Sequence, residues 1–290
     1  MSCSALDSNE HGGHTDPVSP LVVLAVLLVG FASGILSGMF GVGGAVLTTP
    51  GIRAVGATPI EAVGSTLPAI LPGAISGAWR YSRAGLVDWH VSLPSGLLGS
   101  GFAIAGAELS DHVNAHYLMI LTAALLLYSG LRNVRDHVAA PKLVALVAGG
   151  QTTDDAVESD AEPAERTNAP TVVIGLIGAA AGLLAGLLGI GGGLLLMPAY
   201  TVALRMSPKR AVASSLVAVA MFSVPAMAAH ALLGHINWAF ALSLTVGVIP
   251  GAQLGAKLTI GGSEARLRLL TGLFFTVLAL VYGGAELAAL

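Results

Sequence analysis

Charge is scarce in this chain of 290 residues, of which only 10% are Asp, Glu, Lys or Arg. A soluble domain carries about 25% of these residues, so most of this surface faces something other than water. No basic cluster points to nucleic acid as a partner, and the net charge of −3 identifies no other partner. Long apolar runs at 21–29, 118–128 and 269–282 instead predict an integral membrane protein, with the lipid bilayer as its surroundings.

Cysteine is nearly absent as well. Cys3 stands alone in the sequence, which excludes an intramolecular disulfide and a cysteine-rich metal site. No H-E-x-x-H pair is present, so we expect no catalytic residues, no metal and no cofactor. His230 and His235 flank a short loop without a carboxylate or Cys at ligand spacing, which favours a position at the membrane interface over a metal site.

Ionisable residues are missing from the middle of every apolar segment. No Lys or Arg lies mid-segment, and the carboxylates of the apolar regions stand at segment ends, at positions 61, 108, 111, 264 and 286. Proton-coupled carriers usually hold an ionisable group within the membrane. The pattern therefore argues against a carboxylate proton relay, and leaves uniport or coupling to an anion gradient open.

A glycine motif, by contrast, occurs twice. The sequence GILSGMFGVGGAVLTTP at 34–50 returns as GLLAGLLGIGGGLLLMP at 182–198. Each interior glycine costs a helix roughly 1 kcal/mol relative to alanine. Backbone freed at membrane depth is tolerated only where protein or a water-filled cavity surrounds it. The motif thus predicts two broken helices whose breaks face each other, as in transporters built from repeats.

The two copies divide the chain. Eight apolar segments are predicted, at 18–52, 59–82, 89–108, 112–132, 171–204, 208–233, 238–259 and 265–284. We interpret them as an all-α membrane protein of two homologous halves. A polar tail (1–17) precedes the first transmembrane repeat (18–133), and an acidic cytoplasmic linker (134–170) joins it to the second (171–290). Thr58 and Ser207 are predicted to cap the second helix of each half, and Asp88 and Asn237 the third.

The distribution of basic residues predicts that the halves are inverted. If all eight segments cross once, seven basic residues lie inside and six outside, which shows no bias. If the first and fifth segments fold back at their glycines, twelve lie inside and only Arg53 lies outside. Residues 18–52 would form about 52 Å of helix against a membrane core of about 30 Å, which favours folding back. Glu61 and Arg210 occupy equivalent positions, consistent with ends that face opposite sides.

A family likeness accompanies these motifs. The paired G-x-x-x-G-x-x-G-[VI]-G-G sequences, each followed by Pro and a [TS]-P-x-x-A-x-x-[ST]-[ST] segment, resemble the sulfite exporter TauE/SafE family of membrane permeases. The likeness covers about 20–133 and 171–284. It implies transport of sulfite, an organosulfonate or a related small anion across the cytoplasmic membrane, without an enzymatic step. Ala45 stands where the second copy has Gly193, so the first motif is one glycine shorter.

The candidate substrate site lies at the two breaks. Short helices at 45–53 and 193–204 would begin there, and their N-terminal N–H groups can bind an anion without a cationic side chain. Hydroxyls about two turns into the next helix could add donors. The candidate residues are Gly41, Gly43, Gly44, Ser65, Thr66, Gly189, Gly191, Gly192, Ser214 and Ser215. The alternatives are that the glycines only allow close helix packing, and that the hydroxyls bond back to the preceding turn.

Several further interpretations stay open. Thr48 and Thr49 are weaker candidates for the site, and Gln253 could line a pore or bridge helices. Trp79 with its neighbouring arginines fits an interface anchor better than a vestibule. An intramembrane enzyme is disfavoured. Transport of a cation or metal is disfavoured too, because buried carboxylates and thiols are scarce.

Overall fold

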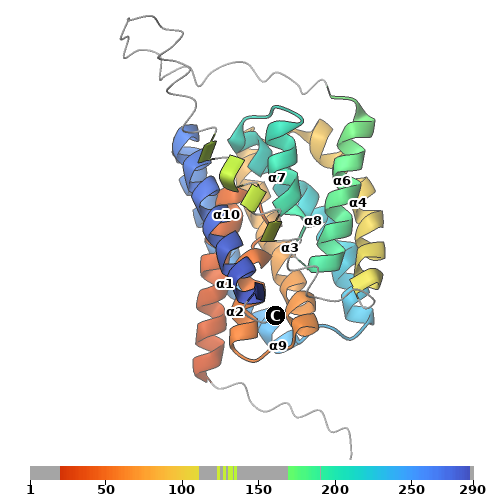
Figure 1. The fold of residues 1–290 in the computed structure, drawn as a ribbon, viewed down its shortest axis with the longest axis vertical. Coiled ribbons are helices and arrows are strands. Elements are labelled where there is room, and N and C mark those ends of the chain that lie inside the picture. The colour runs from red at the N-terminus through yellow and green to blue at the C-terminus, as the bar shows by residue number, and fades with distance from the viewer. Residues whose placement is uncertain are drawn as a thin grey trace, which may run out of the picture.

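A computed structural model describes residues 20–110, 169–189 and 191–287, with short stretches between 123 and 135, and all regular structure in these ranges is helical. The first half contains α1 (Pro20–Phe40), α2 (Ala45–Ala54), α3 (Pro59–Arg83) and α4 (Trp89–Ser110). The second contains α6 (Thr171–Leu188), α7 (Gly193–Val202), α8 (Pro208–Leu232), α9 (Trp238–Gly261) and α10 (Glu264–Leu287) (Figure 1). The all-α prediction is confirmed. The tail at 1–17, most of the segment at 112–132 and most of the linker at 134–170 lie outside the described residues.

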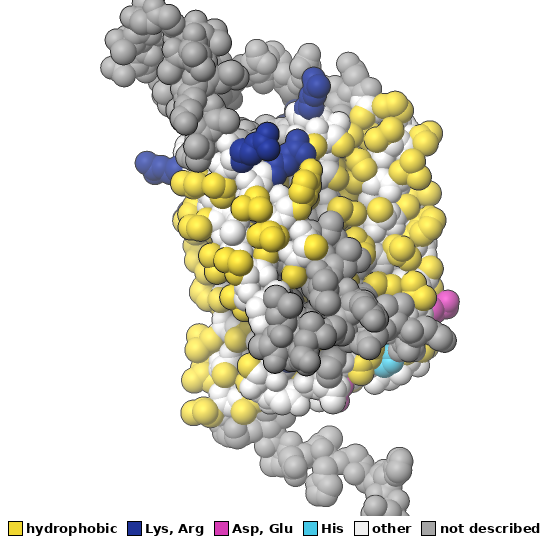
Figure 2. Space-filling view, in the orientation of Figure 1, with side chains coloured by type: hydrophobic (Ala, Val, Ile, Leu, Met, Phe, Trp, Pro, Cys, Tyr) yellow, Lys and Arg dark blue, Asp and Glu magenta, His cyan; other side chains and the backbone are white. Residues whose placement is uncertain are grey.

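The outer surface suits a bilayer. Of the described helices, α1, α6, α8 and α9 are individually long and apolar enough to span one. Large apolar side chains stand exposed on the flanks, among them Leu28, Leu176, Leu242 and Leu280. On the face in Figure 2, apolar side chains cover the flanks, the visible Lys and Arg gather toward the upper end, and the visible acidic and His side chains lie low.

Three of the four predicted caps form. The Thr58 hydroxyl accepts the N–H of Glu61, whose carboxylate accepts the N–H of Thr58 in return. Asn237 and Asp88 each accept an N–H two residues on. The prediction for Ser207 was wrong, because its side chain makes no capping hydrogen bond. Arg210 stands where a capping box needs Glu or Gln, and its guanidinium pairs with the Asp88 carboxylate at 3.6 Å instead.

The two halves interlock through glycine faces. Every fourth residue of α1 near its C-terminal end is a glycine that touches α9: Gly30 against Leu244, Gly34 against Val248 and Gly38 against Ala252. In the same way α6 lies along α4, with Gly178 against Ser95, Gly182 against Gly99 and Gly186 against Ala103. Residues on these faces are small because a Cβ at the glycines would overlap backbone atoms of the partner helix. The first helix of each half therefore packs on the helix that follows the central helix of the other half, so that α1 lies on α9 and α6 on α4.

The first segment of each half reverses direction. Along α2, Gly44 touches Ser33 and Ser37 of α1, and Gly51 touches the earlier Val29, so α2 runs back beside α1. Gly192, which precedes α7, similarly touches the Ala181 carbonyl of α6. In Figure 1, α1 begins at the lower end of the molecule and α6 at the upper end. Each glycine motif thus forms a helical hairpin, as expected from the length of the segment.

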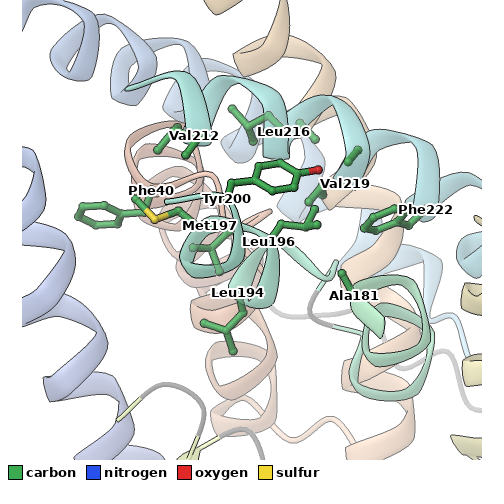
Figure 3. Close-up of a cluster of buried hydrophobic side chains, with 14 of the residues drawn as sticks. Phe40, Ala181, Leu194, Leu196, Met197, Tyr200, Val212, Leu216, Val219 and Phe222 are labelled. Carbon is green, nitrogen blue, oxygen red and sulfur yellow. The ribbon is translucent and has the colours of Figure 1, made fainter. Parts of the chain in front are cut away.

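The core lies around α3, α7 and α8. Leu196, Met197 and Tyr200 of α7 pack among fully buried side chains of α8, including Leu216 and Phe222 (Figure 3). Phe40, the last residue of α1, belongs to the same cluster. The closed apolar packing leaves the glycine breaks enclosed by protein at the centre of the molecule.

Candidate functional site

Each glycine break contains three left-handed residues. Gly41, Gly43 and Gly44 have φ of 69°, 80° and 82°. The equivalent Gly189, Gly191 and Gly192 have φ of 63°, 72° and 66°. Only glycine adopts this region without steric cost, so the motif interrupts the helix by its backbone conformation and not by small size alone. The predicted starts of the short helices at residues 45 and 193 are confirmed.

The N-termini of α2 and α7 are built alike. The carbonyl of Gly44 accepts the N–H groups of Leu47 and Thr48, and the carbonyl of Gly192 accepts those of Leu195 and Leu196. Within the described residues, the buried N–H groups of Val42, Gly43 and Gly44 donate to no oxygen, and those of Gly191 and Gly192 also lack an acceptor. A buried unpaired N–H costs about 1–3 kcal/mol, and helix N-termini carry about half a positive charge. The two breaks therefore present donors suited to an anion.

These two breaks meet. A Cβ on Gly193 would overlap the carbonyl oxygen of Gly41 and crowd Val42. Gly191 lies between Ile70 and Val219, which stand about halfway along α3 and α8. The approach of the two motifs to one another, expected from their duplication, is therefore observed at the middle of the central helices.

Thr66 and Ser215 tie each half to the break of the other. The Thr66 hydroxyl lies 3.2 Å from the carbonyl oxygen of Gly189 and 2.9 Å from that of Val63. The Ser215 hydroxyl lies 3.1 Å from the carbonyl oxygen of Gly41 and 2.9 Å from that of Val212. The alternative of bonding back to the preceding turn is thus observed for both. In this conformation they hold the breaks in place.

Ser65 and Ser214 lie about two turns into the central helices, and their hydroxyls bond to the opposite half instead of to the break glycines. The Ser65 hydroxyl accepts the N–H of Asn237 at 2.8 Å, and the Ser214 hydroxyl accepts the N–H of Asp88 at 2.9 Å. Both side chains are fully buried. Each therefore fixes the residue that begins a helix of the opposite half.

The first break also carries the hydroxyls of Ser33 and Ser37, which sequence reasoning did not single out, and that of Thr49, which was a weaker candidate. Ser33 donates to the carbonyl of Gly44. The buried hydroxyls of Ser37 and Thr49 have no hydrogen-bond partner among the described residues. Ser37 lies directly beside Gly44. The difference between the two copies could have indicated these hydroxyls, because Ser33 and Ser37 of the first copy correspond to Ala181 and Ala185 of the second.

Comparisons with known proteins support the same membrane role. The family model described as "Sulfite exporter TauE/SafE" matches residues 26–282. The chain belongs to the TauE/SafE family. It is 30% identical over 257 residues to a "probable membrane transporter protein" of Xylella fastidiosa, covering 87% of this chain and 90% of the relative. It is 29% identical over 246 residues to the "probable membrane transporter protein YunE" of Bacillus subtilis, covering 82% and 88%. No solved structure matches the chain.

This TauE/SafE protein is therefore a multi-pass membrane protein of a transporter family. The remaining candidates lie away from the breaks. His230 and His235 face each other with their Nδ1 atoms 3.0 Å apart, and His230 Nε2 lies 3.1 Å from the Gly186 carbonyl oxygen. The described residues contain no cluster of three His, Cys, Asp or Glu side chains that could hold a metal. Gln253 lines a separate cavity at one end of α3 and α9.

Proposed function

We propose that this TauE/SafE protein is a permease that moves a small oxyanion across the cytoplasmic membrane without an enzymatic step. Sulfite, an organosulfonate or a related sulfur oxyanion is the favoured substrate, since the matching family model is described as a sulfite exporter. The related chains of Xylella and Bacillus carry transporter names without a substrate. Any compact oxyanion satisfies the chemistry of the site itself.

The meeting of the two glycine breaks carries this proposal. Five N–H groups without an acceptor among the described residues lie at the starts of α2 and α7, at positions 42, 43, 44, 191 and 192. The unpartnered Ser37 hydroxyl beside Gly44 is a second, independent observation. An oxyanion offers several acceptor oxygens to such donors, and the positive ends of both short helices favour negative charge. A cation would meet the wrong end of both dipoles.

The six break glycines would contact the anion through their backbone. Two of them, Gly41 and Gly189, would also be the hinges of the two hairpins. Ser65, Thr66, Ser214 and Ser215 would line the path on either side of the breaks. Their hydroxyls now bond within the protein. Contact with the anion therefore requires these hydrogen bonds to open during the transport cycle. Movement of the two hairpins against α3 and α8 would open them.

The halves, in this proposal, are inverted repeats with boundaries at 18–133 and 171–290. The opposite starting ends of α1 and α6 in Figure 1 support this arrangement. So do the swapped roles of the equivalent residues Glu61, which caps its own helix, and Arg210, which pairs with Asp88. The end where Lys and Arg gather in Figure 2 would then face the cytoplasm, following the positive-inside rule. The linker at 134–170 would lie on that side.

Reconstitution tests the function directly. The purified protein in proteoliposomes is expected to move labelled sulfite, a sulfonate or thiosulfate with saturable kinetics. Alkali and divalent cations serve as controls, and protein-free liposomes give the background. Saturable transport of a cation, with no anion of the panel moved, would overturn the proposal.

A further inference from the structure

A cavity of about 470 Å³ lies between α3 and α9, remote from the glycine breaks. Its lining consists of Ser76, Trp79, Arg80, Arg83, Ala84, Gln253 and Ile260. We refer to it as the α3–α9 basic cavity. None of its residues belongs to the proposed transport site. It is therefore a feature that the proposed function does not use.

The α3 residues of this cavity lie on the side of α3 that faces α9, where the buried Ser76 hydroxyl donates to the Ile249 carbonyl at 3.3 Å. Ser76, Arg80 and Arg83 follow one another at helical spacing and share one face. Ile70 and Tyr81, which contact the break and α1, lie on a different face and are fully buried. The cavity thus opens beside the core and not into the path between the two hairpins.

Among the described residues, the side chains that line the cavity carry positive charge and no negative charge. Neither Arg80 nor Arg83 pairs with a carboxylate in the described part of the chain, and Arg83 stacks over the Trp79 ring at 4.9 Å. Lys209 reaches the rim, where its Nζ donates to the Ile260 carbonyl at 3.4 Å. Arginine forks bind phosphate oxygens in pairs. The composition of the cavity therefore suits a phosphate-type oxyanion.

The surroundings of the cavity favour a lipid as the source of such a phosphate. Ile75 on α3 and Ile249 on α9 are exposed apolar residues. Both adjoin Ser76 of the cavity, because Ile75 precedes it in the chain and the Ile249 carbonyl accepts its hydroxyl. Trp79 is 59% exposed beside them, and exposed tryptophans are typical of the membrane interface. Basic pockets between transmembrane helices bind the headgroups of anionic lipids. We propose that the α3–α9 basic cavity binds the phosphodiester headgroup of an anionic phospholipid, whose acyl chains lie against Ile75 and Ile249.

Lipid retention provides the test. The wild-type protein is taken from nanodiscs of phosphatidylcholine containing phosphatidylglycerol, and the lipids that stay bound are identified by native mass spectrometry. The variant Arg80→Gln/Arg83→Gln should bind phosphatidylglycerol roughly 30-fold more weakly, because each basic side chain near the membrane contributes about a sixfold gain in affinity. The matched control is Arg53→Gln/Arg266→Gln, which removes the same charge from exposed arginines outside the cavity. It should retain the lipid.

A second variant tests the cavity without removing an arginine, in case the double variant fails to fold. Gln253→Glu adds a carboxylate to the cavity without removing an arginine, and should also release phosphatidylglycerol. Equal retention by the wild type, the Arg80/Arg83 variant and Gln253→Glu would overturn the proposal. Displacement of phosphatidylglycerol by excess inorganic phosphate or sulfite would also overturn it, since the cavity would then serve free anions. Phosphatidylcholine binding should be the same in all variants.

Discussion

At the scale of single residues, hydroxyl groups divide into two sets. The hydroxyls of Thr66 and Ser215 lie within hydrogen-bond distance of carbonyls of the opposite break. Those of Ser37 and Thr49 lack partners among the described residues. Among the described residues the second set belongs to the first half, because Ala185 and Met197 stand at the equivalent positions of the copy. The two halves of the proposed site are therefore chemically unequal, with the first break contributing the polar side chains.

Replacement of Ser37 by alanine tests whether that hydroxyl serves the substrate. A lost hydrogen bond to a charged ligand is worth about 1.5–3 kcal/mol, so Ser37→Ala should raise KM for the transported anion roughly tenfold or more. Its melting temperature should stay close to that of the wild type, since the hydroxyl has no partner to lose within the described residues. KM comes from transport in proteoliposomes.

The matched control is Ser33→Ala. The Ser33 hydroxyl donates to the Gly44 carbonyl, so this variant should lose about 1 kcal/mol of stability. An unchanged KM for Ser37→Ala would remove Ser37 from the site.

At the scale of helices and their connections, the sequence predicted the hairpins well. Glycine at φ > 0 leaves a strong mark, because no other residue adopts that conformation cheaply. The starts of α2 and α7 and the cap at Thr58 followed from local chemistry of this kind. The partners of Ser65 and Ser214 could not be predicted in this way. Those partners belong to the other half of the chain, and residue spacing within one helix says nothing about them.

The break at Gly191 offers a test of this element. Gly191→Leu should abolish transport, because a Cβ at φ 72° is strained and would crowd Ile70 and Val219. Membrane insertion should persist, because the hydropathy of the segment is not reduced. Transport assays and membrane-fraction immunoblots measure the two effects.

Gly101→Leu is the control for the same exchange. Gly101 lies on the exposed side of α4, and a Cβ there meets no atom within 4 Å. This variant should transport normally. If Gly191→Leu matched it, the break would not be part of the transport site.

At the scale of the whole molecule, the partnership of helices was the least predictable feature. The glycines at 30, 34 and 38 indicate a closely packed face, but nothing in their spacing names α9 as the partner. The same holds for α6 on α4. The basic residues, in contrast, predicted an orientation from the sequence alone, because the positive-inside rule depends on their position and not on packing.

Cysteine labelling tests that orientation. In a Cys3→Ser background, Ala54→Cys at the end of α2 should react with an impermeant maleimide added to intact cells. Ser82→Cys near the end of α3 should react only after the membrane is opened. Both positions are exposed on the protein. Residue 54 is expected to react from outside because the hairpin returns the chain to the side of the membrane from which α1 entered.

Leu233→Cys is the positive control, since it faces outward whether or not the first segment folds back, and it is exposed too. Labelling of residue 82 from outside, or protection of residue 54, would contradict the inverted arrangement.

The interlocked packing of the halves has a consequence for biosynthesis. The glycine face of α1 is made before Leu244 and Val248 of α9, which cover it and follow more than 200 residues later in the chain. At about 5–20 residues per second, the ribosome needs roughly 10 to 40 seconds to reach them. During that interval only lipid or another protein can cover the face. The newly made first half is thus an incomplete structure in the membrane, and its assembly waits for the synthesis of α9.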